Sequence, residues 1–110
     1  MTADMTGPLG QLGVAVIGAG YWGPNLIRNF RTSPDWDLVA VCDLDTERAE
    51  AVVGARSGVL ITDSLDEVLA REDVHAVAIA TPARTHQGLA EAALRAGKHV
   101  LVEKPLADSV

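Results

Sequence analysis

The feature that most constrains the fold of this chain is a regular alternation of short apolar runs with longer segments of helical spacing. The runs at residues 14–17 and 74–80 are rich in Val, Ile and Ala and are long enough for strands. Between the runs, apolar residues recur every three or four positions, as at Leu26, Ile27 and Phe30. This rhythm is typical of βαβ units, so the sequence predicts an α/β fold with a parallel sheet.

Five strands are expected from this rhythm, and the way they are connected limits their order. Because crossovers between successive parallel strands are right-handed, the chain most simply winds as a Rossmann-type doubly wound sheet of order 3-2-1-4-5. Its switch point lies between the first and fourth strands. The strands are predicted at residues 14–17, 37–42, 59–61, 74–80 and 99–103, after a flexible tail over residues 1–12.

Polar residues and one glycine mark the expected helix ends. Asp45 is a good N-cap for the second helix, and Thr85 for the fourth. Ser64 and Glu67 form an S-x-x-E capping box ahead of a short third helix. Gly97 is placed to be the C-cap of the fourth helix.

The segment after the first strand reads Gly-Ala-Gly-Tyr-Trp-Gly, a G-x-G-x-x-G pattern. Such a string is weak alone, but here it follows a buried strand and opens a helix. In that context Gly18 makes a tight turn, Gly20 lets a pyrophosphate reach the backbone, and Gly23 lets helix and strand pack. The helix N-terminus then faces the phosphates, which predicts a dinucleotide-binding domain over residues 13–110. The alternative is a plain glycine turn.

Asp43 stands at the end of the second strand, twenty positions after Gly23. A carboxylate there can accept hydrogen bonds from both hydroxyls of the adenosine ribose. Asp43 would repel the 2′-phosphate of NADP, and Asp45 and Glu47 add negative charge, so NAD is the expected cofactor. NADP remains possible because Arg48 lies nearby. The alternative for Asp43 is a solvated loop acid or a helix cap.

Ligands of open α/β sheets bind outside the carboxyl ends of the strands, at the switch point. That rule brings together Gly18, residues 81–82 and residues 103–105. Lys104 follows the last strand and precedes a proline that keeps the chain extended, so its ammonium could polarise a substrate hydroxyl. The residues alone leave open a solvated charge paired with Glu103.

Composition excludes several other classes of protein. Nine Lys and Arg against fifteen Asp and Glu give a formal charge of -6, the wrong sign for gripping nucleic acid. No apolar run approaches the roughly 20 residues of a membrane span. The single cysteine, Cys42, can form neither an internal disulfide nor a Cys-rich zinc site. We therefore expect a cytoplasmic chain with no bound metal and no nucleic-acid or membrane partner.

Four segments of the chain closely resemble the Gfo/Idh/MocA family of NAD(P)-dependent sugar and inositol oxidoreductases: GAGYWGPNLIRNF, VCDLD, ATPARTH and EKPLA. The EKP motif is the specific part, because many Rossmann proteins share the glycine fingerprint but few place Glu-Lys-Pro after the fifth strand. The resemblance covers nearly the whole chain after the tail. The YWGPN version of the turn is most similar to members that act on nucleotide-linked sugars.

The resemblance implies roles for residues on the adenosine side of the cofactor. The residues implied to line the pyrophosphate turn are Gly18, Gly20, Tyr21 and Trp22. Asp43 is implied to hold the adenosine ribose. These roles agree with those that the glycine pattern predicts.

The resemblance also implies roles on the nicotinamide side. The residues implied to approach the nicotinamide half are Thr81, Pro82 and His86. Glu103 would lie beside the nicotinamide ribose. Lys104 would be the catalytic lysine, contacting the reacting hydroxyl and steadying its charge while hydride passes between the substrate carbon and the nicotinamide.

Family members continue past the EKP motif with a further helix and strand and then a second domain that binds substrate, whereas this sequence ends at Val110. We therefore expect a chain truncated before the sixth strand and the substrate domain, and inactive by itself. The rival hypothesis is a stand-alone NAD-binding module that senses or regulates. Expected partners are a nicotinamide dinucleotide and a sugar or polyol substrate; association with a second copy of the chain is left open.

Overall fold

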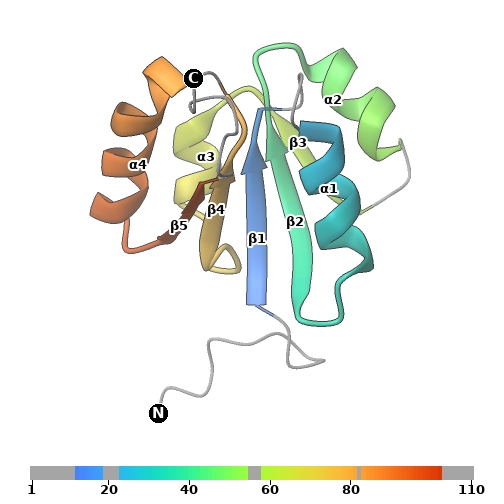
Figure 1. The fold of residues 1–110 in the computed structure, drawn as a ribbon, viewed down its shortest axis with the longest axis horizontal. Coiled ribbons are helices and arrows are strands. Elements are labelled where there is room, and N and C mark those ends of the chain that lie inside the picture. Colours follow the sequence, from blue (N-terminus) through green and yellow to red (C-terminus); the bar gives the residue numbers. More distant parts are fainter. Residues whose placement is uncertain (1–11, 19–22, 55–57, 82, 103–110) are drawn as a thin grey trace.

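The computed structural model describes residues 12–18, 23–54, 58–81 and 83–102. These residues form a five-stranded sheet in the order β3-β2-β1-β4-β5, and each neighbouring pair is parallel. The predicted α/β fold and strand order are confirmed (Figure 1). In chain order the elements are β1 (Leu12–Ile17), α1 (Gly23–Thr32), β2 (Trp36–Cys42), α2 (Thr46–Val53), β3 (Leu60–Thr62), α3 (Leu65–Leu69), β4 (Ala76–Ile79), the 3-10 turn η2 (Ala83–Thr85), α4 (His86–Arg95) and β5 (His99–Val102).

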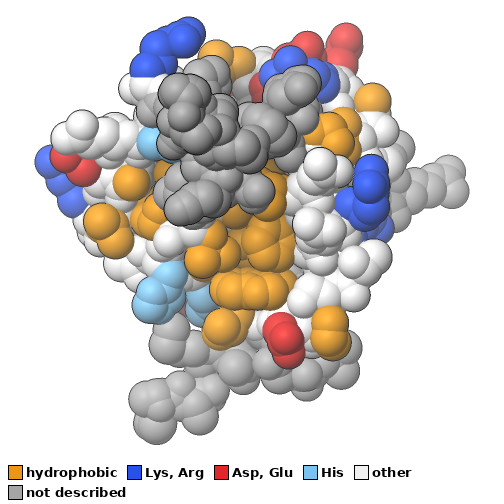
Figure 2. All heavy atoms as spheres, viewed as in Figure 1, with side chains coloured by type: hydrophobic (Ala, Val, Ile, Leu, Met, Phe, Trp, Pro, Cys, Tyr) orange, Lys and Arg blue, Asp and Glu red, His pale blue; other side chains and the backbone are white. Residues whose placement is uncertain are grey.

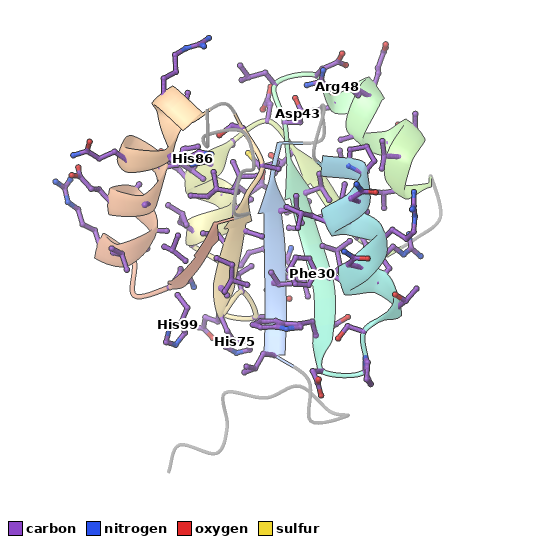
Figure 3. The ribbon with its side chains drawn as sticks, viewed as in Figure 1. Phe30, Asp43, Arg48, His75, His86 and His99 are labelled. Carbon is purple, nitrogen blue, oxygen red and sulfur yellow. The ribbon has the colours of Figure 1, made fainter. Side chains whose placement is uncertain are left out.

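Helices cover both faces of the sheet. On one face, α1 and α2 bury Ile27, Ala49 and Val53 against the strands. On the other face, α3 and α4 contribute Val68 and Ala93 to a second cluster. The side chains of both layers reach toward the strands between them (Figure 3). The sheet is thus held between two apolar layers, which explains why its central strands are apolar on both sides.

The surface retains some apolar side chains. Figure 2 shows hydrophobic side chains gathered in the middle of one face, between α1 and α4. Partly buried Phe30 packs on the core of this face and meets Trp36 edge to face, with ring centroids 5.8 Å apart. Among the described residues, no helix has the length and apolar character needed to cross a membrane.

The strand bounds differ from the predicted ones by a residue or two. β1 begins at Leu12, which the sequence assigns to the tail. β3 runs one residue later than predicted, and β4 is shorter at both ends. β5 is described to Val102, so the predicted last residue of this strand, Glu103, lies outside the described residues.

Two predicted N-caps are present, but one of the capping arrangements differs. Asp45 Oδ1 accepts from the backbone N–H of Arg48 at 3.0 Å, and Ser64 Oγ accepts from that of Glu67 at 3.1 Å. The other contact of a capping box, in which the Glu67 carboxylate would accept from the backbone N–H of Ser64, is wrong. Thr62 stands between the two residues: its Oγ1 accepts from Ser64 N at 3.0 Å and donates to Glu67 Oε1 at 2.6 Å. The hydroxyl of the preceding strand replaces the carboxylate as the partner of the N-cap amide.

The predicted ends of α4 also need correction. Thr85 stands at the N-cap position but makes no side-chain cap; its Oγ1 instead lies 2.6 Å from Thr81 Oγ1. At the other end, Ala96 is the C-cap, and Gly97 follows it with a φ of 82°. The backbone N–H groups of Gly97 and Lys98 donate to carbonyls of the last turn at 3.0 Å, the pattern of a Schellman motif.

β2 carries one extra residue beside β1. The register jumps between Val14, which lies opposite Leu38, and Ala15, which lies opposite Ala40. Val39 is thus left over on β2. Val39 and Ala40 pack in the same hydrophobic cluster, whereas strict alternation would send them to opposite faces. This β-bulge is a feature that the sequence pattern does not indicate.

Gly13 is buried where β1 meets the connection that leads into β4. Its N–H donates to His75 Nδ1 at 2.8 Å, and its carbonyl accepts from the backbone N–H of His75 at the same distance. A Cβ atom on Gly13 would overlap the carbonyl oxygen of Asp73. The close approach of two backbones therefore requires glycine at this position.

Replacing Gly13 with Ala should lower the free energy of unfolding by about 3 kcal/mol, because the backbone at Asp73 must move to admit the methyl group. The matched control is Gly88→Ala in α4, where no atom of the described residues lies within 4 Å of the added carbon, apart from the adjacent residues and the backbone of the helix itself. That variant should be as stable as the parent or up to about 1 kcal/mol more stable. Urea unfolding followed by circular dichroism measures both, and equal effects would contradict the assigned contact.

Candidate functional site

The candidate site lies at the carboxyl ends of β1, β2 and β4. At this edge, the residue that directly follows each of these strands donates a backbone hydrogen bond to the last residue of a neighbouring strand. Gly18 N donates to Cys42 O at 2.7 Å, and Ala80 N donates to Ile17 O at 2.8 Å. Asp43 N donates to the last residue of β3 at 3.0 Å. The residues that follow three central strands are thus fixed side by side at one edge of the sheet.

Gly18 leaves no room for a side chain at this edge. Its φ is 102°, a conformation that L side chains rarely adopt. A Cβ atom would also lie 2.9 Å from Thr81 Cγ2 and 3.2 Å from the carbonyl carbon of Ala80. The predicted need for glycine at this turn thus has two causes, one conformational and one steric.

α1 begins at Gly23, shortly after this turn, and Gly23 is buried. The first turn of α1 has no acidic residue, so the positive end of the helix is not neutralised by its own side chains. A glycine without space for a side chain beside an uncompensated helix N-terminus fits a pyrophosphate group. The chain's own residues therefore suit a dinucleotide at this edge.

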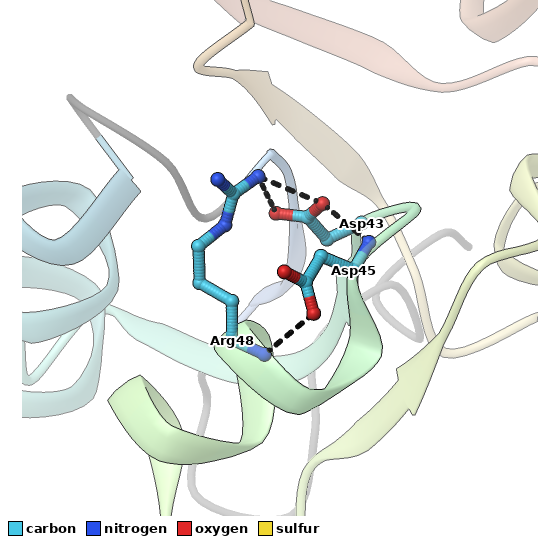
Figure 4. Close-up of polar contacts among 3 residues, drawn as sticks. All are labelled: Asp43, Asp45 and Arg48. Carbon is cyan, nitrogen blue, oxygen red and sulfur yellow. Dashed lines mark hydrogen bonds and ion pairs between the residues drawn. The ribbon is translucent and has the colours of Figure 1, made fainter.

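Asp43 lies beside this turn, at the end of β2. Its side chain is 5% exposed. Oδ1 accepts from the backbone N–H of Asp45 at 2.9 Å, and Arg48 Nη2 lies 3.0 Å from Oδ1 and 2.9 Å from Oδ2 (Figure 4). Asp43 is therefore neither a solvated loop acid nor the cap of α2, since Asp45 fills the capping role.

On the other side of Gly18, residues after β4 form a second polar group. Thr81 Oγ1 lies 2.6 Å from Thr85 Oγ1, and the carbonyl oxygen of Thr81 lies 2.7 Å from His86 Nε2. Because a carbonyl oxygen only accepts, Nε2 of His86 must carry the hydrogen. The structure thus brings Thr81 and His86 together, with Thr81 next to the turn at Gly18. His86 lies on the β4 side of the sheet (Figure 3).

Six of the residues singled out from the sequence lie outside the described residues, and their roles remain predictions. They are Gly20, Tyr21, Trp22, Pro82, Glu103 and Lys104. Within the described ranges, no group of three or more His, Cys, Asp or Glu side chains could hold a metal ion.

Two features of the site do not follow from the sequence pattern. Leu44 is 91% exposed directly beside buried Asp43, which the residue types alone do not indicate. The pairing of Arg48 with Asp43 depends on where α2 starts relative to β2. Only the spacing of five residues across a helix start hints at this contact.

Cys42 is buried at the same edge and is 7% exposed. Burial, followed by the negative charges of Asp43 and two further carboxylates, raises the pKa of its thiol from 9.0 to about 11. The thiolate is the nucleophilic form, so this thiol is unreactive near neutral pH. Its place in the site is that of a small apolar side chain.

Comparison with known proteins gives a consistent picture. Residues 12–110 match the family described as "Oxidoreductase family, NAD-binding Rossmann fold". An inositol 2-dehydrogenase from Rubrobacter xylanophilus is 42% identical over 107 residues, which is 96% of this chain and 30% of that protein.

Solved structures agree with this match. GenD2 from gentamicin A biosynthesis, in complex with NAD, has a TM-score of 0.80 and 39% identity over 92% of this chain and 29% of its own. A 3-ketoreductase from Actinomadura kijaniata, in complex with TDP-benzene and NADP, has a TM-score of 0.77 and 33% identity over 87% of this chain and 30% of its own. The chain thus spans 29–30% of the length of these three proteins.

The environment of Cys42 predicts slow thiol chemistry. A rise in pKa from 9.0 to about 11 leaves about a hundredfold less thiolate at pH 8, and burial slows attack further. Reaction of the folded chain with a disulfide reagent should therefore be at least about a hundredfold slower than in guanidinium, and should accelerate up to about pH 11. Equal rates in the folded and unfolded chain would contradict the described environment.

Proposed function

The chain belongs to the Gfo/Idh/MocA oxidoreductase family and carries its NAD-binding Rossmann domain, and from this premise we propose how it acts. It binds a nicotinamide dinucleotide across the carboxyl edge of the sheet. The cofactor serves hydride transfer to or from a hydroxyl-bearing carbon of a sugar, a nucleotide-linked sugar or an inositol. The names of the relatives support this substrate class. A cytoplasmic location completes the proposal.

One observation carries the proposal most directly. A buried carboxylate, Asp43, stands beside a glycine turn that admits no side chain, on adjacent central strands of a parallel sheet. This is the pairing that a dinucleotide needs, because the turn receives the pyrophosphate and the carboxylate receives the ribose hydroxyls. In the proposal, Gly20, Tyr21 and Trp22 complete the turn.

The nicotinamide half is proposed to lie toward β4. Thr81, Pro82 and His86 face it, and Glu103 lies beside its ribose. When bound, the nicotinamide supplies the chemistry by accepting or donating a hydride. Lys104 donates a hydrogen bond to the reacting oxygen of the substrate and stabilises the charge that develops there.

The charges near the ribose support NAD rather than NADP as the preferred cofactor. Asp43, Asp45 and Glu47 place three carboxylates in or beside the first turn of α2, against the single guanidinium of Arg48. A 2′-phosphate in this position would meet mainly like charge, whereas a free 2′-hydroxyl can donate to Asp43.

Leu44 is proposed to form part of the adenine site. Its side chain is 91% exposed and follows the ribose carboxylate directly in the chain. An exposed apolar side chain next to a ribose site offers a flat base a surface to cover, and burying that side chain is favourable. Packing against the described residues does not account for a leucine at this position.

Calorimetry with NAD and NADH tests the proposed function. The chain should bind at least one form with saturation at or below about millimolar concentration. Gly20→Val should abolish binding while the circular dichroism spectrum stays that of the folded chain, because a side chain there takes the space of the pyrophosphate. Absence of binding by the parent chain, or undiminished affinity in the folded variant, would refute the assigned site.

Replacement of Leu44 by Ser should weaken NAD binding by about fivefold, because the adenine loses an apolar contact. The control is Leu94→Ser in α4, whose side chain is 61% exposed and lies outside the proposed site. Neither exposed substitution should change thermal stability measurably. An effect on NAD affinity of the same size in both variants would contradict the adenine contact.

A further inference from the structure

The guanidinium of Arg48 lies directly on the carboxylate of Asp43 (Figure 4). A single nitrogen, Nη2, contacts both carboxylate oxygens, at 3.0 and 2.9 Å. The two side chains differ strongly in exposure, since that of Arg48 is 50% exposed and that of Asp43 only 5%. The half-exposed side chain of Arg48 thus covers the buried carboxylate of Asp43.

The same two oxygens are the atoms that a ribose requires. Recognition of the adenosine ribose by an acid at this position uses the carboxylate as acceptor for the sugar hydroxyls. Here Oδ1 already accepts from the N–H of Asp45 at 2.9 Å in addition to the guanidinium. Oδ1 thus already has two donors, so a ribose hydroxyl that approaches this oxygen competes with the guanidinium for it.

We infer that Arg48 is a displaceable occupant of the ribose-binding carboxylate and thereby a residue that determines the relative affinity for NAD and NADP. This inference rests on the proposed function. With NAD, the contact of Arg48 with Asp43 has to be broken, so Arg48 opposes binding. With NADP, the displaced guanidinium meets the 2′-phosphate, so Arg48 supports binding.

The local structure lets the side chain move while its backbone stays in place. The backbone N–H of Arg48 is held by the N-cap Asp45 at 3.0 Å, in the first turn of α2. The flexible stem beyond it is half-exposed, and ion pairs with such a member contribute little to stability. Release of the guanidinium therefore leaves the helix start intact.

A different reading makes Arg48 a purely structural support that holds Asp43 in the orientation the ribose needs. The two readings predict opposite signs. If Arg48 only positions Asp43, its removal weakens NAD binding. If Arg48 occupies the carboxylate, its removal strengthens NAD binding and weakens NADP binding.

The experiment compares the parent chain with Arg48→Met, which keeps the length of the stem and removes the charge. The control is Arg71→Met, because Arg71 makes the other ion pair of the described residues, with Asp73 at 2.7 Å. That pair precedes β4 and so lies at the opposite edge of the sheet from the site. Dissociation constants for NAD and NADP are measured by calorimetry at one fixed ionic strength.

In Arg48→Met, the dissociation constant for NAD should fall by about two- to fivefold, the range that a half-exposed ion pair can supply. That for NADP should rise by about tenfold, because the phosphate loses a charge-assisted partner. Arg71→Met should leave the ratio of the two constants unchanged. Arg48→Lys, with a compact charge, should retain most of the NADP affinity, and it decides the matter if the methionine variant does not fold.

Weaker NAD binding in Arg48→Met, or an NAD-to-NADP ratio that does not move, would overturn the inference while leaving the proposed function in place. A parent chain that binds neither dinucleotide would overturn both. Equal changes in the Arg48 and Arg71 variants would assign the effect to net charge and would also reject the specific role of Arg48.

Discussion

The carboxyl edge of the sheet depends on the contact between β1 and the end of β4 at Gly18. The turn there has a positive φ, and an added Cβ atom would meet Thr81 at 2.9 Å. In the same residue, the amide donates to the carbonyl of Cys42 at 2.7 Å. One residue without a side chain therefore links the ends of β2, β1 and β4. Asp43 and Thr81, far apart in the sequence, become neighbours of the same turn for this reason.

The buried acid beside that turn is paired with a cation, although the chain as a whole carries a formal charge of -6. The first turn of α1 has no acid, and the buried acid beside it is covered by a guanidinium. The negative charge of Asp43 still acts on its neighbour, where it adds to burial in raising the pKa of the Cys42 thiol. Among the described residues, the positive features next to that turn include the N-terminus of α1 and the guanidinium of Arg48, and a polyanionic ligand can meet both.

The order of the strands follows from the sequence because alternating strands and helices joined by right-handed crossovers leave few topologies. Local signals were also reliable where a side chain bonds the backbone a few residues further on, as Asp45 does with the N–H of Arg48 at the start of α2. They failed where a third residue competes. The hydroxyl of Thr62 accepts from the N–H of Ser64, the role that the capping box predicts for Glu67. The hydroxyl of Thr85 bonds that of Thr81 and does not cap α4. The contact of Arg48 with Asp43 was likewise beyond a pattern of residue types, because it depends on the placement of a helix against a strand.

The extra residue in β2 has a consequence for the acid at the end of that strand. Beyond the bulge, Ile17 lies opposite Cys42, so Asp43 falls level with Gly18. Without it, the register would place Val41 opposite Ile17, and Asp43 would extend about 3.3 Å further and point to the other face of the sheet. The bulge therefore shifts the register of β2 by one residue, and this shift sets the acid level with the glycine turn. The number of residues between the glycines and the acid therefore predicts where the carboxylate lies only in chains whose second strand contains the same bulge.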